Sequence, residues 1–324
     1  MIEERIVALW HGYIRLLRTD KEHVRVAERW VRALLLIVPY LVVYLLLLIR
    51  GAVWRPLIID HTTEDGIHLR SQLPDFIQNY VYLFGTWEPD LVAFMRRRLR
   101  PGDTFIDVGA NIGYLSALAS RLVGPHGVVV AIEPAPFASA ALQETVAMND
   151  LTNIRLVSVA VSDRDGELPL FVAPSHASGM TTTVDCHNHG FREQGRVRAA
   201  PLGSLVTREE LATTRLIKID VEGAEDRVLT GMLASVDALP ADAELVVEVM
   251  SKWWSDPRLR PIDVLRPFLD RGFHVYLLPA DYAPWRYLWA KDVGAPQRLR
   301  DFAVLERRGG QLDLVLSRSD ADAL

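Results

Sequence analysis

The sequence predicts an α/β fold built on a mostly parallel sheet with helices on both faces. From residue 101 onward, short and almost wholly apolar segments alternate with helical patterns, as is typical of parallel strands covered on both sides. A loop with two glycines separates the first of these strands from the helix after it, in TFIDVGANIGYLSALASRLV (104–123). Ligands of such sheets bind beyond the carboxyl ends of the strands, so the residues at those ends are the first candidates for function.

The individual elements follow from local patterns. Upstream of the sheet, LIIDHTTEDGIHLRS predicts two short strands around a Glu-Asp-Gly turn, and a helix is expected from Thr86 to Leu99. The expected strands of the sheet are TFIDV, GVVVAIEP, IRLVSVAV, RLIKID, ELVVEVM and HVYLLPA, with a final strand at FAVLERR (302–308). Helices are expected at 137–148 and 224–233. Residues 174–200 break the alternation, which predicts a long loop of the kind that often carries function.

Composition excludes several classes of function. The net charge of the 324 residues is −5, which disfavours a nucleic acid as partner. The single cysteine, Cys186, forms no disulfide within the chain. It lies in CHNH (186–189), near His176. We expect no metal there, because two histidines in a loop rarely bind one without a carboxylate ligand, and we interpret the segment as a loop that is solvated or contacts substrate. His176 and His187 stay open as alternative general bases.

An apolar segment near the N-terminus predicts membrane association. Residues 33–49 carry no charge and are bracketed by Arg32 and Arg50, with Trp30 and Trp54 just outside. The segment is at the short end of what spans a bilayer, and its tryptophans would suit the interface. The alternative is a helix buried against the rest of the chain or a second subunit. Membrane association is favoured because a docked surface helix would have a polar outer face.

The form of membrane association stays open at this stage. Pro39 allows a kinked or re-entrant insertion, and the upstream RIVALWHGYIRLL is expected to lie along the surface as an amphipathic helix.

The glycine loop points to a nucleoside without phosphates. Glu133 follows the second strand about 20 residues after Gly113, where an acidic side chain accepts hydrogen bonds from ribose. The pattern from Gly109 to Gly113 is not the dinucleotide fingerprint, and Asp107 would repel a pyrophosphate. S-adenosylmethionine fits, because Asp107 would favour its ammonium group directly or through water. The alternatives are a nicotinamide or nucleotide-sugar enzyme, and a purely structural role in which Asp107 and Asn111 cap the helix.

The block KIDVEGAE (218–225) provides the candidate catalytic residues. Lys218 and Asp220 share one face of a central strand, and Glu222 lies past its end. A buried lysine needs a partner, and Glu248 in the next strand is the expected one. This pair is either structural or part of the active site. For Asp220 and Glu222, at the mouth of the sheet, we expect a functional role, with one of them as the general base.

Between Thr86 and Met250 the chain resembles the FkbM family of S-adenosylmethionine-dependent methyltransferases. The resemblance lies in FIDVGANIGYLSALA, VVAIEPAP, LTNIRLVSVAVSDRDGELPLF and RLIKIDVEGAEDRVLTGM. It implies a class I methyltransferase fold with a seven-stranded sheet that ends in a reversed hairpin, with S-adenosylmethionine as the cofactor. The cofactor-binding candidates are then Asp107, Gly109, Ala110, Asn111, Gly113, Glu133, Pro134 and Asp163, and the catalytic candidates are Lys218, Asp220 and Glu222. Gly203 stands where relatives carry an aspartate, which weakens inference about the substrate side.

The resemblance also sets the expected function. It implies O-methylation of a sugar or secondary metabolite, and the apolar N-terminus points to a lipid-linked glycan or a lipid as acceptor, with methyl transfer to nitrogen left open. A non-catalytic, membrane-tethered protein of the same fold is the other alternative. The expected regions are a membrane-associating segment (1–55), a lead-in hairpin and helix (56–100), the cofactor-binding methyltransferase domain (101–310) and a C-terminal tail (311–324).

The expected location is the membrane, with the catalytic domain facing the cytoplasm, or else the cytoplasm itself. Six basic residues between Arg15 and Arg32 precede the apolar segment, so the positive-inside rule would place the rest of the chain outside. The cofactor argues for the opposite orientation. The oligomeric state is not predicted.

Overall fold

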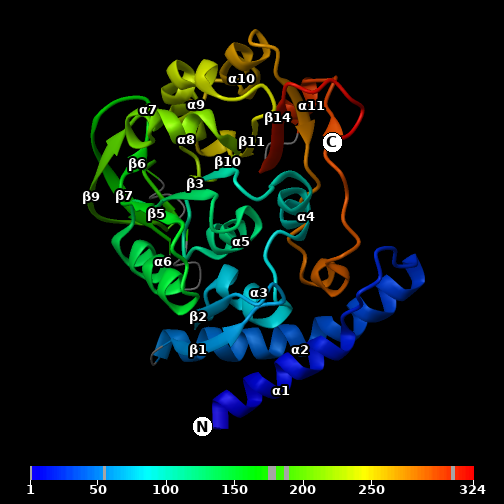
Figure 1. Cartoon of the computed structure of the whole chain (residues 1–324). Helices are drawn as coiled ribbons and strands as arrows, with labels where there is room; N and C mark the ends of the chain where they lie inside the picture. The colour runs from blue at the N-terminus through cyan, green and yellow to red at the C-terminus, as the bar shows by residue number, and fades with distance from the viewer. Residues whose placement is uncertain (1, 54–55, 174–179, 186–189, 308–310) are drawn as a thin grey trace.

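The computed structural model describes residues 2–53, 56–173, 180–185, 190–307 and 311–324. Within these residues a sheet of eight strands forms the centre of the molecule (Figure 1). In spatial order they are β5 (Ile154–Val157), β4 (Val128–Ile132), β3 (Thr104–Val108), β10 (Thr214–Ile219), β11 (Glu244–Val249), β14 (Leu312–Ser317), β12 (His274–Leu277) and β13 (Gln297–Arg298). The first five are parallel, and β14 is antiparallel to both of its neighbours. The predicted seven-stranded sheet with a reversed strand is confirmed, and β13 adds a two-residue edge.

Helices cover both faces of this sheet, as predicted. On one face lie α4 (Pro89–Arg98) and α5 (Tyr114–Val123), and on the other lie α9 (Glu225–Met232) and α10 (Pro261–Leu269) (Figure 1). Successive strand residues point to opposite faces, so Leu216 packs in one apolar core and Ile217 in the other. The strands are therefore buried on both sides, which explains their almost continuous apolar sequences.

The prediction of the last strand was wrong. Residues 303–307, expected as a strand, form the short helix α11 (Ala303–Arg307), whose residue types mostly favour helices. The last strand is β14, inside the segment 311–324 that was expected to be a tail, and all six of its residues are buried. Asp313 interrupts the apolar residues of this strand, so the segment lacks the continuous apolar pattern from which the other strands were predicted.

The expected loop at 174–200 is partly a second sheet. This sheet has the order β6 (Ala160–Val161), β9 (Arg192–Ala200), β7 (Gly166–Val172) and β8 (Thr181–Thr182). The strand predicted at 154–161 is accordingly divided between β5 in the main sheet and β6 in the second one. His176, Cys186, His187 and His189 lie outside the described residues.

The N-terminal region packs along one side of the domain. The predicted hairpin is confirmed as β1 (Leu57–Thr62) and β2 (His68–Leu73), and α3 (Phe76–Phe84) follows it. The helix α1 (Ile2–Leu17) lies beside α3, and α2 (Val26–Val53) lies beside the 3-10 helix η5 (Pro284–Trp289). Figure 1 shows both N-terminal helices on the far side of α3 from the sheet.

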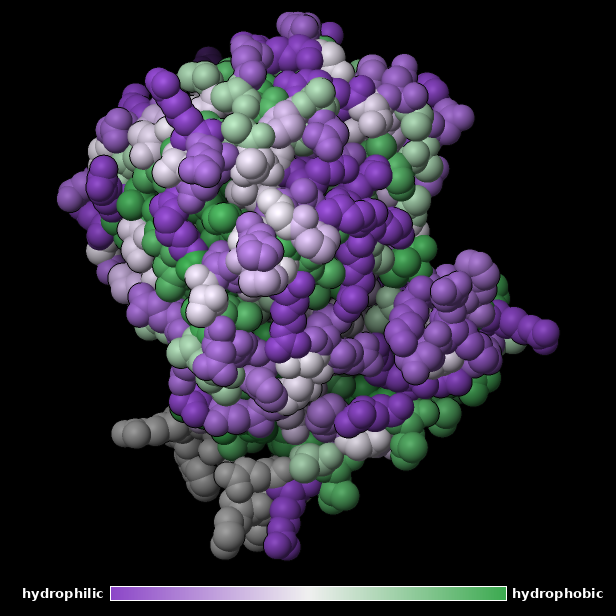
Figure 2. Space-filling model, viewed as in Figure 1, coloured by the Kyte–Doolittle hydropathy of each residue, from purple (hydrophilic) through white to green (hydrophobic). Residues whose placement is uncertain are grey.

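The helix α2 is docked along one face and apolar on the other. Leu36, Tyr40 and Leu47 are buried, and the Tyr40 ring contacts those of Tyr80 and Phe84 on α3. The opposite face exposes a row of large apolar side chains, and Figure 2 shows hydrophobic residues along this lower edge of the molecule. This row is Leu34, Leu35, Val38, Leu41, Val42, Leu45, Leu46 and Ile49. The alternative of a docked helix is thus confirmed for one face, and the exposed face lacks the polar residues expected of a docked surface helix. Trp54 lies outside the described residues.

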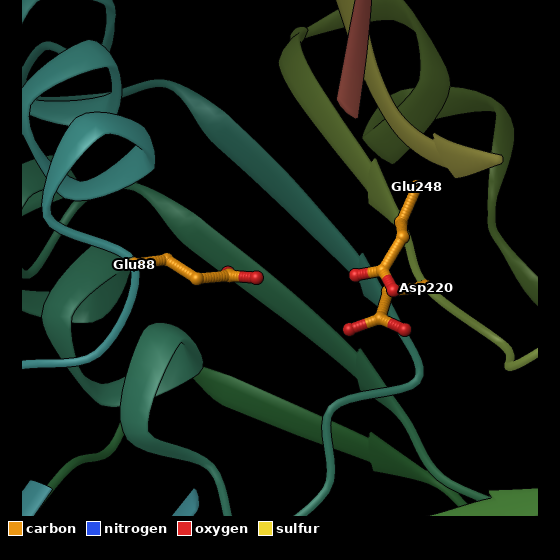
Figure 3. A group of neighbouring side chains, drawn as sticks. All are labelled: Glu88, Asp220 and Glu248. Atoms are coloured by element: carbon orange, nitrogen blue, oxygen red, sulfur yellow. The ribbon is translucent and has the colours of Figure 1, made fainter. Parts of the chain in front are cut away.

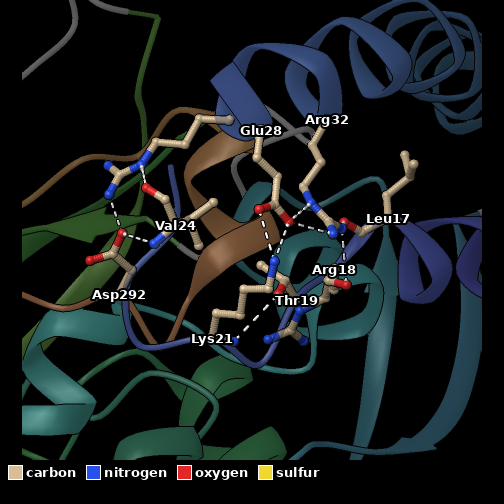
Figure 4. A network of polar contacts seen from close by, with 9 residues as sticks. Leu17, Arg18, Thr19, Lys21, Val24, Glu28, Arg32 and Asp292 are labelled. Atoms are coloured by element: carbon tan, nitrogen blue, oxygen red, sulfur yellow. Dashed lines mark hydrogen bonds and ion pairs between the residues drawn. The ribbon is translucent and has the colours of Figure 1, made fainter. Parts of the chain in front are cut away.

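Polar contacts fix the turn between α1 and α2 (Figure 4). Glu28 accepts from Lys21 Nζ at 2.9 Å and from Arg32 Nη2 at 2.8 Å, and Arg32 also bonds to the Leu17 carbonyl. Asp292 pairs with Arg29, which joins α2 to the C-terminal part of the domain. The two helices are therefore held to the domain at the turn as well as along α3.

Candidate active site

The loop between β3 and α5 is packed tightly against the end of β10. Gly109 and Gly113 both have left-handed backbones, with φ of +84° and +85°. A Cβ on Gly109 would lie 1.8 Å from the Asp220 carbonyl oxygen, and one on Gly113 would lie 2.3 Å from Leu142 Cδ1. Because the clash at Gly109 would be with backbone, glycine is required there for the close approach to the end of β10, and at Gly113 the left-handed backbone favours glycine.

Glu133 follows β4 and ties that strand to the glycine loop. Its buried carboxylate accepts the backbone N–H groups of Asn111 and Ala135, each at 2.9 Å. The loop is held a second time, because the Ala110 N–H donates to the Ile132 carbonyl at 3.0 Å. Burial raises the pKa of Glu133 to about 7, against the lowering effect of the two N–H donors. A carboxylate has about four acceptor positions, so Glu133 can still accept from further donors.

Asp107 is enclosed rather than exposed to a ligand. Its side chain is fully buried, and Oδ2 accepts from the Ser116 hydroxyl at 2.6 Å. Oδ1 lies 3.9 Å from Lys218 Nζ. Burial raises the pKa of Asp107, while Lys218 and the Ser116 hydroxyl lower it. The structure thus gives Asp107 the role of balancing Lys218, and brings it into no direct contact with the pocket described below.

The predicted pairing of Lys218 with Glu248 was wrong. Lys218 Nζ lies 2.9 Å from Asp220 Oδ2 and donates to the Gly109 carbonyl at 3.3 Å. The strand register explains this, because Lys218 lies beside Asp107 on β3, whereas its neighbour on β11 is Val246. Burial lowers the pKa of Lys218, but the surrounding carboxylates outweigh burial and raise it above the usual value.

A pocket opens at the carboxyl ends of β3, β4 and β10. Six of the predicted site residues line it: Gly109, Asn111, Glu133, Pro134, Asp220 and Glu222. The other predicted residues, Asp107, Ala110, Gly113, Asp163 and Lys218, are not among its described lining residues. Asp163 is exposed and accepts a hydrogen bond from the Ser162 hydroxyl at 3.1 Å. The rest of the wall includes apolar residues of β6, β7 and α3, together with Thr181–Thr183.

Glu222 reaches the same pocket from the turn after β10. Its backbone is left-handed, with φ of +52°. Its Oε2 is buried and has no hydrogen-bond partner among the described residues. Burial, followed by the nearby Asp220 and Glu225 carboxylates, raises the pKa of Glu222 well above its usual range.

Further carboxylates lie near Asp220: Glu248, which the sequence analysis named as the partner of Lys218, and Glu88 and Asp313, which it did not select. One carboxylate oxygen each from Glu88, Asp220 and Glu248 lies within 4.8 Å of the others (Figure 3). Glu88 comes from the loop before α4, and its Oε1 accepts from the Tyr282 hydroxyl at 3.0 Å. Asp313 on β14 lies beside Glu248 in the antiparallel register.

Two signals in the sequence could have identified these residues. Pro89 favours the first position of a helix, which makes Glu88 the capping residue, where Ser, Thr, Asp or Asn is preferred. In the structure Glu88 makes no capping bond, consistent with another role. Asp313 is a charged residue inside a buried strand, an arrangement that is rare without a partner.

Comparisons with known proteins agree with this geometry. A family model described as the methyltransferase FkbM domain matches residues 107–275. Methyltransferase sdnD of Sordaria araneosa is 31% identical over 213 residues, which cover 57% of this chain and 79% of sdnD. The 31-O-demethyl-FK506 methyltransferase FkbM of Streptomyces tacrolimicus is 30% identical over 160 residues, which cover 41% of this chain and 61% of that relative.

Among solved structures, methyltransferase FkbM from Methylobacillus flagellatus KT is similar with a TM-score of 0.40 at 13% identity. That match covers 74% of this chain and 52% of the other.

Substitution of Gly109 by alanine tests the close approach of the loop to β10. Gly272 is the matched control, because its φ is +81° and a Cβ there would meet nothing within 4 Å. Gly272→Ala should lower the free energy of unfolding by about 1–2 kcal/mol, the cost of a left-handed backbone. Gly109→Ala should cost about 1–3 kcal/mol more, because the methyl group overpacks the site. Urea unfolding measures both, and equal losses would contradict the described contact.

Proposed function

The chain belongs to the FkbM family of methyltransferases, and we propose that it transfers the methyl group of S-adenosylmethionine to a hydroxyl of a sugar, a lipid-linked glycan, a lipid or a secondary metabolite. The observation that carries this proposal is the pocket at the carboxyl ends of β3, β4 and β10, with the buried Glu133 on its wall. Membership of this family excludes the alternatives of a nicotinamide enzyme, a nucleotide-sugar enzyme and a non-catalytic protein of the same fold.

The residues around the pocket fit S-adenosylmethionine. Glu133 would accept the ribose hydroxyls, because its carboxylate is fixed by two backbone N–H groups and has acceptor capacity left. Gly109 and Asn111 would lie against the amino-acid end of the cofactor, and the apolar wall of Val159–Val161 and Leu170 would enclose its adenine. When bound, the cofactor supplies an electrophilic methyl group on a positively charged sulfur.

Asp220 is the residue best placed to act on the acceptor. It lies on the pocket wall, and Lys218 holds its Oδ2 at 2.9 Å. As the acceptor oxygen forms its bond to the methyl carbon, the hydroxyl proton has to leave, and the Asp220 carboxylate would take it. A positioned base of this kind contributes about 10²–10⁴ in rate. The streptomycete relative is named for an O-demethyl compound, which supports a hydroxyl as the acceptor group.

The exposed face of α2 supports an acceptor at a membrane. By length and composition, Val26–Ile49 could cross a bilayer. The face of this helix opposite the apolar row, however, is packed on α3 and η5. We therefore place α2 in the plane of the membrane surface, with its apolar row in the lipid. Trp30 is 73% exposed near the start of the helix, and tryptophan favours the membrane interface. With α2 lying flat, the domain stays on one side of the membrane, and the cofactor argues for the cytoplasmic side.

The pH dependence of cofactor affinity tests the role of Glu133. Ribose hydroxyls donate to the ionised carboxylate, so affinity should rise as the pH increases through about 7, the raised pKa of Glu133, and then level off. Glu133→Gln should raise the Kd about 10–100-fold, because each hydrogen bond to a charged group contributes about 1.5–3 kcal/mol, and should flatten the pH profile. Titration calorimetry measures both.

Glu209→Gln is the control for this experiment, because Glu209 is exposed, lies outside the described pocket wall and is not a candidate cofactor-binding residue. It should keep the affinity and the pH profile of the unaltered protein. A folded Glu133→Gln variant with unchanged affinity would contradict the cofactor assignment.

The variant Asp220→Asn tests the catalytic assignment. With membrane lipid and glycan extracts as acceptors, it should lower the rate of labelled methyl transfer by about 10²–10⁴. Cofactor affinity should stay nearly unchanged, because the cofactor-binding contacts are assigned elsewhere. Glu222→Gln should have a smaller effect on the rate. Full activity combined with a lowered melting temperature would instead assign Asp220 a purely structural role.

Vesicle flotation tests the membrane assignment. The full chain should float with vesicles of phosphatidylcholine and phosphatidylglycerol, and a triple variant of Leu34, Leu41 and Leu45 to serine should not. These residues are 73%, 57% and 56% exposed, and burial of each contributes about 1.5–3 kcal/mol. Phe137→Ser, an exposed apolar position on α6 (Pro136–Met148), is the control and should still float. A soluble dimer that the triple variant dissociates would show that a second copy covers this face.

A further inference from the structure

The side of Asp220 away from the glycine loop carries an unusual concentration of negative charge. Glu88, Asp220 and Glu248 come from three separate parts of the chain and point toward one another (Figure 3). Their nearest carboxylate oxygens all lie within 4.8 Å of one another. Like charges at this distance repel strongly in a poorly solvated site. Either bound protons or a cation must therefore neutralise part of the negative charge.

Asp313 provides a second and independent observation. It is 7% exposed, and its Oδ2 has no hydrogen-bond partner among the described residues. In the antiparallel pair of β11 and β14 it lies directly beside Glu248, which is itself 9% exposed. Two buried carboxylates therefore lie side by side, and the nearby Tyr282 hydroxyl has a single proton, which it donates to Glu88.

Lys218 neutralises only part of this group, because within the described part of the chain it forms an ion pair with Asp220 alone among the three carboxylates. Its Nζ pairs with Asp220 Oδ2, lies 3.9 Å from Asp107 and donates to the Gly109 carbonyl. These contacts direct the ammonium group toward β3 and the glycine loop. The Tyr282 hydroxyl donates to Oε1 of Glu88, but Oε2 of the same carboxylate is buried without a hydrogen-bond partner among the described residues.

We propose that Glu88, Asp220 and Glu248 bind one hard divalent cation, of the class of Mg²⁺, Mn²⁺ or Ca²⁺, with Asp313 as a neighbouring carboxylate that adds negative charge. Such cations prefer carboxylate oxygen, and the described set contains no soft ligand. An ion between three oxygens at this spacing lies about 2.8 Å or less from each, close to the distances of about 2.0–2.6 Å found in magnesium and calcium sites. A small rotation of the side chains closes the difference.

Asp220 connects this cation site to the pocket. Lys218 pairs with its Oδ2, and one of its oxygens lies within 4.8 Å of those of Glu88 and Glu248. An acceptor hydroxyl entering from the pocket could complete the coordination, and the ion would then hold the acceptor oxygen beside Asp220. This role in catalysis rests on the proposed function, whereas the binding of the cation does not.

Titration of the full chain with Mn²⁺ tests the proposal, without cofactor or acceptor. Electron paramagnetic resonance should detect about one bound Mn²⁺ per chain, and Mg²⁺ or Ca²⁺ should compete for it. The melting temperature should rise with the divalent chloride and not with sodium chloride of equal ionic strength. Glu88→Gln and Glu248→Gln should each weaken Mn²⁺ binding at least tenfold, and Asp313→Asn should weaken it less.

The control is Glu209→Gln, which removes an exposed carboxylate outside the cluster and should leave Mn²⁺ binding unchanged. Glu248→Gln should fold, because removal of one like charge relieves repulsion and should raise the melting temperature measured with a chelator. The proposal is overturned if millimolar Mn²⁺ does not bind, or if a Glu88→Gln, Glu248→Gln double variant binds it as tightly as the unaltered chain. Such a result would show that protons neutralise the cluster, and would leave the cofactor assignment intact.

Discussion

The buried ammonium group of Lys218 holds the centre of the active site together. It lies 2.9 Å from Asp220, 3.9 Å from Asp107 and 3.3 Å from the Gly109 carbonyl. It thereby joins β10, β3 and the glycine loop at the point where cofactor and acceptor are expected to meet. A buried ion pair of this kind adds little net stability, but loss of one partner is costly because the other charge remains unpaired. The main effect of the network is therefore to fix the relative positions of β10, β3 and the glycine loop.

The same network separates two electrostatic environments. On the glycine-loop side, Asp107 and Lys218 balance each other, and the pocket wall contains Glu133 held by backbone donors. On the other side, Glu88, Glu248 and Asp313 face Asp220 with little compensation. Asp220 belongs to both environments. The charge of its carboxylate is therefore influenced both by Lys218 and by the protons or cation that neutralise the acidic group.

Much of the fold was predictable because parallel strands buried on both faces have continuous apolar sequences. The pocket residues Glu133 and Asp220 were also predictable, since they follow strands that end at the same edge of the sheet. The contact of Lys218 with Asp220 follows from their shared face of β10, whereas its contact with Asp107 depends on strand register, which places Asp107 beside it and Val246 on the other side. Glu88 and Asp313 lie far from the motifs in sequence and join the site only through the packing of α4 and the reversed strand β14.

A single short helix links the apolar face of the molecule to the pocket. On α3, Ile77 lines the pocket, while Tyr80 and Phe84 contact Tyr40 of α2. Ile77 and Tyr80 are three residues apart, less than one helical turn, so the same turn of α3 contributes to the pocket wall and to the contact with α2. If α2 lies in the membrane as proposed, an acceptor with a lipid part would be held on the same side of the domain as this helix. The contacts of α2 with η5 and with α3 fix the position of the apolar row relative to the pocket.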